Sequence, residues 1–399
     1  MPDYPSVRAP RIRPARRLDN IPPYLFAEID RKVAERKAAG VDVISFGIGD
    51  PDLPTPEFIV GALAEAARDP STHRYPSYFG LPAFRRAVAG FYRRRFGVEL
   101  DPDTQVLPLL GSKEGIAHLA WAFVDPGDPV LVTEPGYPVY EVGTILAGGE
   151  PVHIPLTAEE GWFPNFATVD GAVADRAKLL WLCYPSNPTA AVATLDQYQE
   201  AVRFAAVHDL LLANDNAYSE ITFDGFVAPS VLQVPGAMDV AVEFGSLSKI
   251  FNMTGWRIGW VVGNPVAIEA LGRVKTNIDS GIFNAVQRAG VAALESGMPH
   301  LPELVATYQR RRDRIMEVFW EAGWKVDAPK GALYVWLPTP PGESSVAFTA
   351  RLLDEAGVVV APGTGYGPSG EGYIRLSLTI PDAQLEAGCE RVRKALVGA

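Results

Sequence analysis

Lys249 is the residue in this sequence whose chemistry most needs an explanation. It lies in the stretch GSLSKIFNMTGWRIGW, residues 245–260, among hydroxyl side chains and eight positions before Arg257. A buried structural lysine needs a carboxylate partner, and no acidic residue lies between Ser246 and Trp260. A group from elsewhere in the chain, or a ligand, must therefore satisfy this amine.

Polar and reactive residues also follow four other apolar runs that have the composition of strands. The runs QVLPLL, PVLVT, AKLLWLC and LLLAN are followed by Ser112 and Lys113, by Tyr137, by Asn187, and by Asp215 and Tyr218, respectively. Ligands of open α/β sheets bind beyond the carboxyl ends of the strands, so we expect these side chains to meet at one edge of a sheet. The sequence thus predicts one site that combines an amine, a carboxylate, phenols, an amide and hydroxyls.

Each of these residues also has a purely structural interpretation. Gly111-Ser112-Lys113 is a common way to begin a helix, and Asn187 before a proline is a turn signal. Asp215 could cap a helix, and Tyr137 between a glycine and a proline could only pack a turn. Independent coincidences at five strand ends are improbable, so we favour a shared ligand.

Pyridoxal phosphate would account for the whole set. This cofactor needs a lysine for its aldehyde, a carboxylate at the pyridine nitrogen, donors at the phenolate oxygen, a stacking ring and a phosphate site. Lys249 would then be satisfied covalently, as a Schiff base. Ser246 and Arg257 would lie beside the phosphate dianion, next to the amides at the start of a helix predicted over residues 112–123.

The elements that must position these residues alternate along the middle of the chain. Between about residues 105 and 265, seven short β-branched runs alternate with helical patterns, which predicts a mostly parallel sheet covered by helices. Within 112–123, the helical period places Ile116, Leu119, Ala120 and Phe123 on the face toward the sheet. After about residue 300, a charged helical segment, short strands and a final helix indicate a smaller α+β domain.

We therefore predict an α/β fold with a seven-stranded, mostly parallel sheet in a large domain and a smaller, discontinuous α+β domain. Residues 1–45 would form an N-terminal arm and part of the small domain. Residues 46–300 would form the large cofactor-binding domain, and residues 301–399 the C-terminal part of the small domain.

Composition and charge disfavour several classes of function. The 399 residues include 36 Lys and Arg against 47 Asp and Glu, a net charge of −11, which disfavours a nucleic-acid partner. The sequence contains no run of eighteen apolar residues, the length that a membrane-spanning helix needs. The five histidines and two cysteines lack the spacing of metal ligands. The N-terminal arginines are separated by prolines and precede no apolar segment, so we expect no secretory signal and a cytoplasmic location.

With these residues, the sequence resembles the class I and II aminotransferases of fold type I. The resemblance extends from ISFGIGDPDLPTP to GYIRLSL, with the motifs in the family's order. It implies that SLSK carries the Schiff-base lysine, Lys249, and that DNAY places Asp215 on the pyridine nitrogen. It also implies cofactor contacts from a larger group, namely Tyr218 and Asn187 on the phenolate oxygen, Tyr137 on the ring, and Ser112, Lys113, Ser246 and Arg257 on the phosphate.

The resemblance also implies how substrates and a second subunit take part. Gly49 of GIGDP would lie against the substrate, and Arg375 of YIRLS would bind the α-carboxylate. Tyr75 of HRYPSYFG would reach the phosphate in the neighbouring subunit, which predicts a homodimer with shared sites. The implied reaction moves an amino group between an L-amino acid and a 2-oxo acid by a ping-pong mechanism, with Lys249 as the general base.

The segments PPYLFAEIDRK and VKTNIDSGIFNAVQ are most similar to the LL-diaminopimelate aminotransferase branch of this family. Residues 277–284 offer Asn277, Asp279, Ser280 and Asn284 but no arginine, which disfavours a dedicated aspartate enzyme. We therefore expect LL-diaminopimelate as donor, with glutamate and 2-oxoglutarate as the exchanging pair. The same polar residues would equally suit a subunit interface, and Ala190 departs from the family pattern, which has glycine there in many members.

Three other functions are weighed against this one. An alanine or broad-range aminotransferase would share the same cofactor residues, and so would a pyridoxal-phosphate C–S lyase. A transcription regulator with an aminotransferase-like domain would need a DNA-binding module, and only about forty residues precede the first motif. We therefore keep the two enzyme alternatives and disfavour the regulator.

Overall fold

The computed structural model describes residues 13–21, 31, 33–36, 38 and 40–397. The predicted N-terminal arm up to residue 12 lies outside these residues, as does the motif PPYLFAEIDRK at 22–32 except for Arg31. A short 3-10 helix, Arg16–Asn20, is the first described element.

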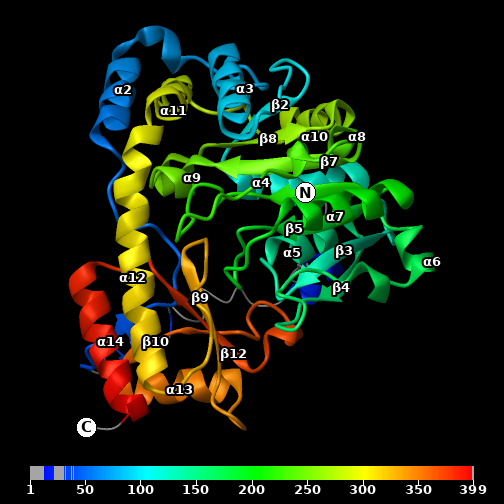
Figure 1. Ribbon diagram of the computed structural model, residues 1–399. Coiled ribbons are helices and arrows are strands. Elements are labelled where there is room, and N and C mark those ends of the chain that lie inside the picture. The colour runs from blue at the N-terminus through cyan, green and yellow to red at the C-terminus, as the bar shows by residue number, and fades with distance from the viewer. Residues whose placement is uncertain (1–12, 22–30, 32, 37, 39, 398–399) are drawn as a thin grey trace, which may run out of the picture.

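A seven-stranded sheet forms the centre of the larger part of the molecule (Figure 1). Its strand order is β2-β8-β7-β6-β5-β3-β4. The bounds in chain order are β2 Val106–Leu109, β3 Pro129–Glu134, β4 Glu150–Pro155, β5 Leu179–Cys183, β6 Leu211–Asp215, β7 Ala241–Ser246 and β8 Gly259–Gly263. Among these seven strands only β8 runs against the others, because it pairs antiparallel with both β7 and β2. The predicted mostly parallel sheet is therefore confirmed.

The sheet is buried on both faces because helices cover each of them. One face packs against α4 (Ser112–Phe123), α5 (Val139–Ala147) and α10 (Pro265–Thr276). The other packs against α3 (Pro82–Phe96), α7 (Leu195–Val207) and α11 (Asn284–Ser296), with α2 (Glu57–Arg68) beside α11. Successive residues of β5 alternate between the two cores, so the strand must be apolar throughout. Ile116, Leu119 and Ala120 of α4 are buried as their spacing predicts, and Phe123 is half-buried.

A smaller three-stranded sheet lies below the large one in Figure 1. Its order is β11-β12-β9, with both pairs antiparallel, and its strands are Tyr334–Pro338, Ala361–Pro362 and Tyr373–Ser377 for β9, β11 and β12. Helices α12 (Leu301–Glu321), α13 (Ser345–Ala356) and α14 (Asp382–Val397) pack around this sheet. The early strand β1 (Ile44–Ser45) pairs with β10 (Val358–Val359), so residues far apart in sequence meet here.

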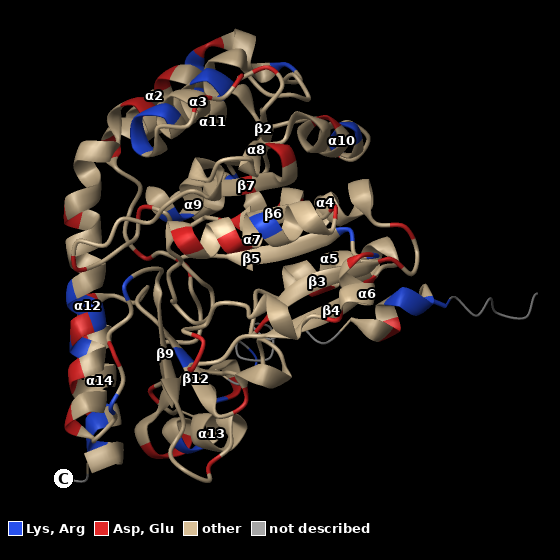
Figure 2. Ribbon diagram, turned by 45° about the vertical axis from the view of Figure 1, so that its right-hand side comes forward, with Lys and Arg blue, Asp and Glu red and all other residues tan. Residues whose placement is uncertain are grey.

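Helix α12 runs alongside both parts of the molecule and carries charges of both signs on its surface (Figure 2). Arg314 of α12 is 2.7 Å from Glu386 of α14, and Arg310 is 2.8 Å from Asp382. Exposed pairs of this kind add little stability each, about 0–1 kcal/mol. The contact between α12 and α14 therefore depends mainly on buried residues such as Ile315 and Phe319.

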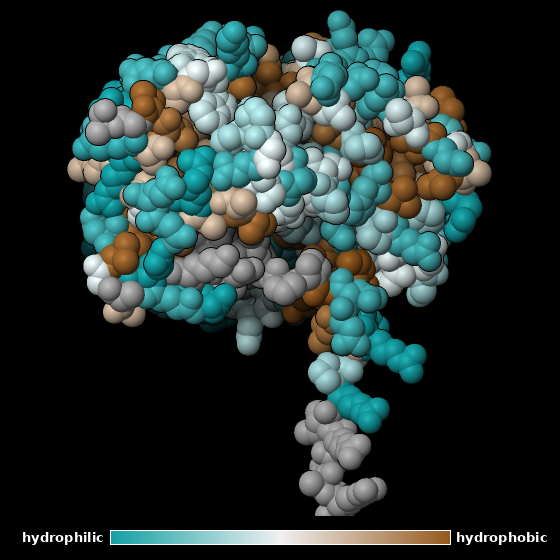
Figure 3. Space-filling model, turned by 90° about the horizontal axis from the view of Figure 1, so that it is seen from below, coloured by the Kyte–Doolittle hydropathy of each residue, from teal (hydrophilic) through white to brown (hydrophobic). Residues whose placement is uncertain are grey.

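Seen from the side of the small sheet, the surface is largely hydrophilic, and its apolar residues form several separate groups (Figure 3). Across the described ranges, none of the helices combines the length and the apolar composition that a membrane span requires. Nor do three or more His, Cys, Asp or Glu side chains of the described chain come together in a way that would suit a metal ion.

Candidate active site

Lys249 is the first element of the site that the fold explains. Strand β7 ends at Ser246, and the one-turn helix α9, Leu247–Ile250, follows directly. Lys249 is half-buried, and its Nζ donates to the carbonyl oxygen of Gly49 at 3.3 Å. Among the residues that the structure describes, no carboxylate forms an ion pair with it. The amine is thus held beside a neutral carbonyl and remains open to a ligand.

Arg257 reaches the same corner because β8 reverses direction. Ser246, the last residue of β7, lies opposite Gly259, the first residue of β8, so the loop between them returns to the sheet edge where it began. The Arg257 guanidinium donates to the carbonyl oxygens of Thr254, at 2.8 Å, and Leu110, at 3.4 Å. It packs so closely on Gly111 that a Cβ there would collide with it. Only glycine allows this approach of arginine to the start of α4.

The start of α4 leaves backbone amides available at this corner. Gly111 is the N-cap residue, with φ +78°, and α4 has no side-chain cap within the part of the chain that the structure describes. The helix does begin at Ser112, as the structural alternative predicts, but its N-cap is a glycine, which has no side chain to bond to the first amides. Amides at a helix start attract anions. Nearby, the Ser248 hydroxyl is buried and has no hydrogen-bond partner in the described part of the chain. The corner formed by Gly111, Ser112, Ser246, Ser248 and Arg257 is called the anion corner below.

Asp215 ends β6 and is only 5% exposed. Its Oδ2 accepts a hydrogen bond from the Tyr140 hydroxyl at 2.9 Å, and its Oδ1 accepts one from the Ala217 amide at 3.3 Å. Burial raises the pKa of Asp215 to about 6, while these hydrogen bonds and the charge of Lys249 act in the opposite direction. Asp215 begins no helix, so the capping alternative is wrong. A buried carboxylate supported by neutral donors is suited to an added cationic group.

Asn187 and Arg375 join the two parts of the molecule. Arg375 of β12 is fully buried; its Nη1 donates to Asn187 Oδ1 at 2.8 Å and its Nη2 to the Gly47 carbonyl at 2.7 Å. The guanidinium carbon lies 4.1 Å from the ring centre of Tyr334 and 4.9 Å from that of Tyr366. A buried arginine between two rings has a fixed plane, which suits bidentate binding of a carboxylate.

Tyr218 lies beyond the end of β6 and is 4% exposed. Its hydroxyl is 2.9 Å from that of Tyr334, and burial raises the pKa of Tyr218 well above its ordinary value. Gly49 passes so close to Tyr334 that a Cβ at residue 49 would collide with the phenol. The segments that carry residues 49, 218 and 334 therefore meet at one point.

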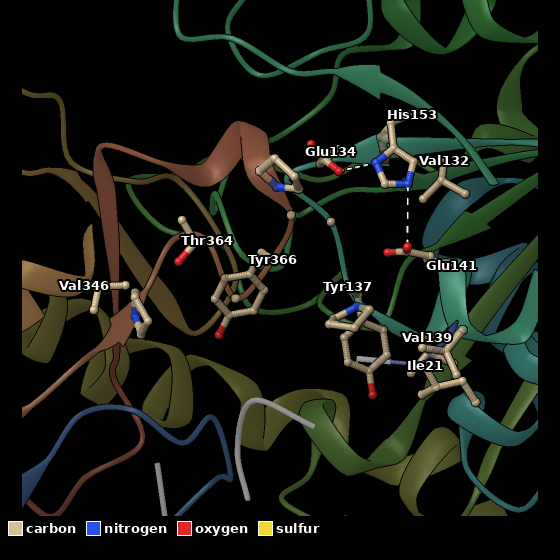
Figure 4. A pocket seen from close by; sticks show the side chains of 18 of the residues that line it. Ile21, Val132, Glu134, Tyr137, Val139, Glu141, His153, Val346, Thr364 and Tyr366 are labelled. Atoms are coloured by element: carbon tan, nitrogen blue, oxygen red, sulfur yellow. Dashed lines mark hydrogen bonds and ion pairs between the residues drawn. The ribbon is translucent and has the colours of Figure 1, made fainter. Parts of the chain in front are cut away.

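A cavity of about 930 Å³ opens beside Tyr137, between β3 and α5 on one side and α13 with residues 359–368 on the other (Figure 4). Tyr137 and Tyr366 both line it, and Lys113 lies in its wall. Tyr137 is half-buried and meets Tyr140 edge-on, with ring centres 5.7 Å apart. The cavity thus begins at residues that the sequence assigns to the cofactor.

Glu134 ties the two walls of this cavity together. Its carboxylate accepts hydrogen bonds from the Ser369 amide, at 2.9 Å, and hydroxyl, at 2.6 Å, and also contacts His153 Nδ1. Burial opposes ionisation, but the hydrogen bonds from His153 and Ser369 hold the pKa of Glu134 below its usual value. The bond to Glu134 in turn raises the pKa of His153. This contact fixes the turn at residues 367–370 against β3.

Tyr75 and the polar residues of segment 277–284, which the sequence also singles out, have other surroundings in the structure. Tyr75 is 89% exposed and is not brought into this group of residues within one chain. Asp279 is used inside the chain, because its Oδ2 lies 2.6 Å from Lys275 Nζ and its Oδ1 accepts from the Gly281 amide at 2.6 Å. Asn277 likewise donates to the Arg273 carbonyl. These polar residues stabilise the segment, which removes much of their value as an argument about the substrate.

Ala190, at a position where many family members have glycine, adopts a backbone conformation that favours glycine. It is 2% exposed and has φ +56°, the left-handed conformation that favours glycine. Its amide donates to the Ser186 carbonyl at 3.1 Å, which closes the turn that carries Asn187. A non-glycine residue in this conformation costs roughly 1–2 kcal/mol. The turn is formed all the same, so the substitution leaves Asn187 in place.

Several functional contacts were not predicted from the sequence. Tyr140 had a usable signal, since it lies one helical turn after Tyr137. Tyr334 and Tyr366 had none, because they reach Arg375 only through the packing of the small sheet. The Glu134–His153 contact joins neighbouring strands, with Val132 opposite His153 in the register.

The residues present fit pyridoxal phosphate. The anion corner offers helix amides, an arginine and an unsatisfied buried hydroxyl to a phosphate. Asp215 offers a carboxylate to a ring nitrogen, and Lys249 offers an amine that no described carboxylate neutralises. The fold and these side chains together define an enzyme of the pyridoxal-phosphate type.

Comparison with known proteins identifies the family. The pattern of aminotransferase classes I and II matches residues 41–392, and the chain therefore belongs to this family, whose members use pyridoxal phosphate. It is 54% identical over 378 residues, 95% of the chain and 97% of the relative, to an LL-diaminopimelate aminotransferase of Dehalococcoides mccartyi. It is 53% identical, over 96% of the chain and 98% of the relative, to one from Moorella thermoacetica.

Solved structures confirm the fold. A substrate-bound BacF structure from Bacillus subtilis matches with a TM-score of 0.92 and 37% identity, covering 96% of this chain and 98% of that one. A mutant aspartate aminotransferase of Thermus thermophilus matches with a TM-score of 0.90 and 30% identity, covering 96% and 100%. Relatives with different named substrates thus share this fold, so the fold alone does not select the substrate.

Proposed function

We propose that this aminotransferase takes LL-diaminopimelate as amino donor and 2-oxoglutarate as acceptor. The observation that carries the proposal is the 53–54% identity, over at least 95% of the chain, to relatives named for that donor. The structural neighbours with other names are more distant, at 30–38% identity. The polar segment 277–284 adds little, because Asp279 is already paired with Lys275.

We propose the following division of labour at the site. When bound, pyridoxal phosphate supplies an aldehyde for an amine and a ring that accepts the electron pair of the broken Cα–H bond. Asp215 would keep the ring nitrogen protonated, and Lys249 would move the Cα proton. Tyr218 and Asn187 would contact the phenolate oxygen, and Tyr137 would stack on the ring.

The phosphate would lie at the anion corner, bound by Ser112, Lys113, Ser246 and Arg257. Support comes from the start of α4, which has no side-chain cap among the described residues, and from the arginine that packs on Gly111. Dianion binding at such a corner combines helix amides with charge-assisted hydrogen bonds.

Arg375 would bind the substrate α-carboxylate, with Gly49 against the substrate. Arg375→Lys tests this role, because a point charge replaces a planar fork. KM should rise for all amino donors while cofactor binding is retained. A loss confined to one class of side chain would show that Arg375 recognises the side chain instead.

We propose a homodimer in which Tyr75 completes the partner's phosphate site. The exposure of Tyr75, Tyr78, Phe79 and Phe283 in one chain supports a covered surface there. Mixing Tyr75→Phe subunits with Lys249→Ala subunits should rebuild one site in which both residues are native. Activity of the mixture no higher than that of either parent would contradict shared sites.

We also propose that residues 46–300 form the cofactor-binding domain and that residues 1–45 and 301–399 form the small one. The pairing of β1 with β10 supports this division at the N-terminal boundary. The cavity of Figure 4 would then lie between the two domains, with Tyr137 in its wall.

The donor is tested by a panel of amino acids with 2-oxoglutarate as acceptor. LL-diaminopimelate should give the highest kcat/KM. If alanine or an aromatic amino acid exceeds it tenfold, about 1.4 kcal/mol of transition-state preference, the donor assignment is wrong. A single turnover without acceptor addresses the lyase alternative, because an aminotransferase retains the amino group on its cofactor, whereas a lyase releases ammonia.

A further inference from the structure

Tyr334 makes three contacts that no other described residue combines. Its hydroxyl lies 2.9 Å from the Tyr218 hydroxyl, its ring lies 4.1 Å below the Arg375 guanidinium, and its phenol fills the space beside Gly49. It is 2% exposed, so the Tyr334 side chain makes all three contacts shielded from solvent. Tyr334 therefore touches both the residue proposed for the phenolate oxygen and the residue proposed for the α-carboxylate.

The register of the small sheet explains the contact with Arg375. Strands β9 and β12 are antiparallel, with Trp336 opposite Arg375 and Tyr334 opposite Ser377. Tyr334 and Arg375 are thus diagonal neighbours on one face of the sheet, a separation that aromatic and long side chains can bridge. The small sheet itself holds the ring under the guanidinium.

The stacked ring limits how the guanidinium can turn. Asn187 and the Gly47 carbonyl occupy one donor each on Nη1 and Nη2, and Tyr366 covers the guanidinium at 4.9 Å. A cation on an aromatic face gains about 0.5–2 kcal/mol, depending on how far the pair is desolvated. Replacing the Tyr334 ring by an aliphatic side chain would let the Arg375 guanidinium rotate but would leave its charge in place.

The Tyr334 hydroxyl affects the direction in which the Tyr218 hydroxyl donates its proton. Two phenols that share one hydrogen bond have two protons, of which one lies in the bond and one is left for a third group. When Tyr334 is the donor, the proton of Tyr218 is directed away from Tyr334 and is available to an acceptor. Removing the Tyr334 hydroxyl would leave the Tyr218 proton without that direction.

We propose that Tyr334 is a positioning residue that aligns Tyr218 through its hydroxyl and Arg375 through its ring. The inference rests on the roles proposed above for Tyr218 and Arg375. It makes two separable claims, because the hydroxyl and the ring can be removed independently. A residue that only fills the core would show no such separation.

Tyr334→Phe tests the hydroxyl. With the ring retained, KM for amino donors should stay within about twofold, since the cation–ring contact survives. The pH midpoint of the visible absorption of the bound cofactor should move upward by about half a unit or more, because a donor to the phenolate oxygen is weakened. A midpoint that moves by less than about 0.2 units overturns this half of the inference.

Tyr334→Leu tests the ring. KM should rise about tenfold for every amino donor, which is the effect of losing a desolvated cation–ring contact. The phenylalanine variant should restore KM but not the absorption midpoint. If the leucine variant keeps the KM of the parent enzyme, the ring does not align Arg375.

Tyr308→Phe is a matched control, because Tyr308 is also fully buried and donates to a side chain, Asn252 Oδ1 at 3.3 Å. It should lower the unfolding midpoint by a similar amount to Tyr334→Phe without moving the absorption midpoint. If all three variants lower kcat, cofactor binding and stability in parallel, Tyr334 is only structural and the inference is wrong.

Arg375→Lys separates this inference from the proposed function. If Arg375→Lys raises KM and Tyr334→Leu does not, the inference about the ring fails and the role of Arg375 stands. If Arg375→Lys leaves KM unchanged, the role proposed for Arg375 is wrong, and the ring half of the inference falls with it. The absorption midpoint of Tyr334→Phe decides the hydroxyl half in either case.

Discussion

Of the lysines that the structure describes, Lys249 and Lys275 lie at least partly inside the protein, and their surroundings differ. Lys275 of α10 is 1% exposed, with its Nζ 2.6 Å from Asp279 and 3.4 Å from Glu114. Lys249 is half-buried, and its Nζ donates to a backbone carbonyl at 3.3 Å. A buried charge that serves the fold is neutralised by carboxylates, whereas one that serves chemistry is left for a ligand to satisfy. The charged partner, more than the degree of burial, distinguishes the two.

The carboxylates differ in the same way. Glu114 and Asp279 meet an ammonium directly, whereas Asp215 is held by a phenol and an amide. Burial raises the pKa of Asp215 to about 6 because these neutral donors do not compensate fully for lost hydration. Under the proposed function, Asp215 gains a cationic partner only when the cofactor ring binds.

The largest expected effect separates the two lysines by activity. Lys249→Ala should lower kcat by about 10³-fold or more, because it removes the residue proposed as general base and as point of covalent attachment. Lys275→Met should leave kcat of the folded enzyme within about tenfold, less than one step of general acid–base catalysis contributes. Steady-state kinetics on both variants checks this, and similar losses in both would contradict the division.

The free energy of unfolding should show the reverse order, with the larger effect from the change at Lys275. Lys275→Ala should destabilise the cofactor-free protein by about 3–5 kcal/mol, because two carboxylates lose a buried partner. Lys249→Ala should cost less than about 1 kcal/mol, since a single hydrogen bond to a carbonyl is lost. Urea unfolding measures both, and the triple variant Lys275→Met, Glu114→Gln, Asp279→Asn should recover part of the loss as a control. Equal destabilisation by the two alanine variants would refute the comparison.

Asp215 should make the cofactor-free protein less stable as pH rises from about 4 to about 6. Its pKa is about 6 in the folded chain against the ordinary value of 3.8, so within this window the folded state binds more protons than the unfolded state. The difference corresponds to about 3 kcal/mol. Asp215→Asn should flatten the profile by that amount in unfolding experiments at successive pH values, and parallel profiles for the two proteins would count against a raised pKa.

Tyr140→Phe should have the smallest effect. The Asp215 carboxylate then loses one neutral hydrogen bond, worth about 1 kcal/mol, so its pKa should rise further and kcat/KM should fall about fivefold. The pH–stability profile of the cofactor-free variant should extend toward higher pH. Tyr308→Phe provides the control for loss of a buried hydroxyl, and an unchanged profile would mean that Tyr140 does not act on Asp215.

The sequence predicted the large sheet and most of the candidate site because a single rule applies to both. Parallel strands end at one edge, so the residues after PVLVT, AKLLWLC and LLLAN had to meet there. The pair Lys275 and Asp279 was also visible as an i, i+4 spacing, although we interpreted Asp279 as part of a substrate site. The i, i+4 spacing indicated the observed ion pair, whereas the resemblance to a substrate-binding segment did not.

Contacts between the two sheets could not be predicted in this way. Tyr334 meets Tyr218 across 116 positions in the chain, and the contact depends on how the small sheet docks. Nothing in GALYVWL distinguishes this tyrosine from a core residue, since all but the last position of β9 are buried. The sequence shows alanine at position 190 where many family members have glycine, but the left-handed conformation of this residue is seen only in the structure.

The reversal of β8 has a consequence for how the site assembles during folding. Because β7 and β8 form an antiparallel pair, Ser246, Lys249 and Arg257 belong to one hairpin whose closure costs little chain entropy. The bond between Arg375 and Asn187 joins residues 188 positions apart, and it can form only after the C-terminal part of the chain has reached its middle. The part of the anion corner between Ser246 and Arg257 is therefore local in the chain, whereas the contact of Arg257 with Leu110 spans 147 positions. The bond between Arg375 and Asn187, on the side proposed to bind the carboxylate, is longer-range still.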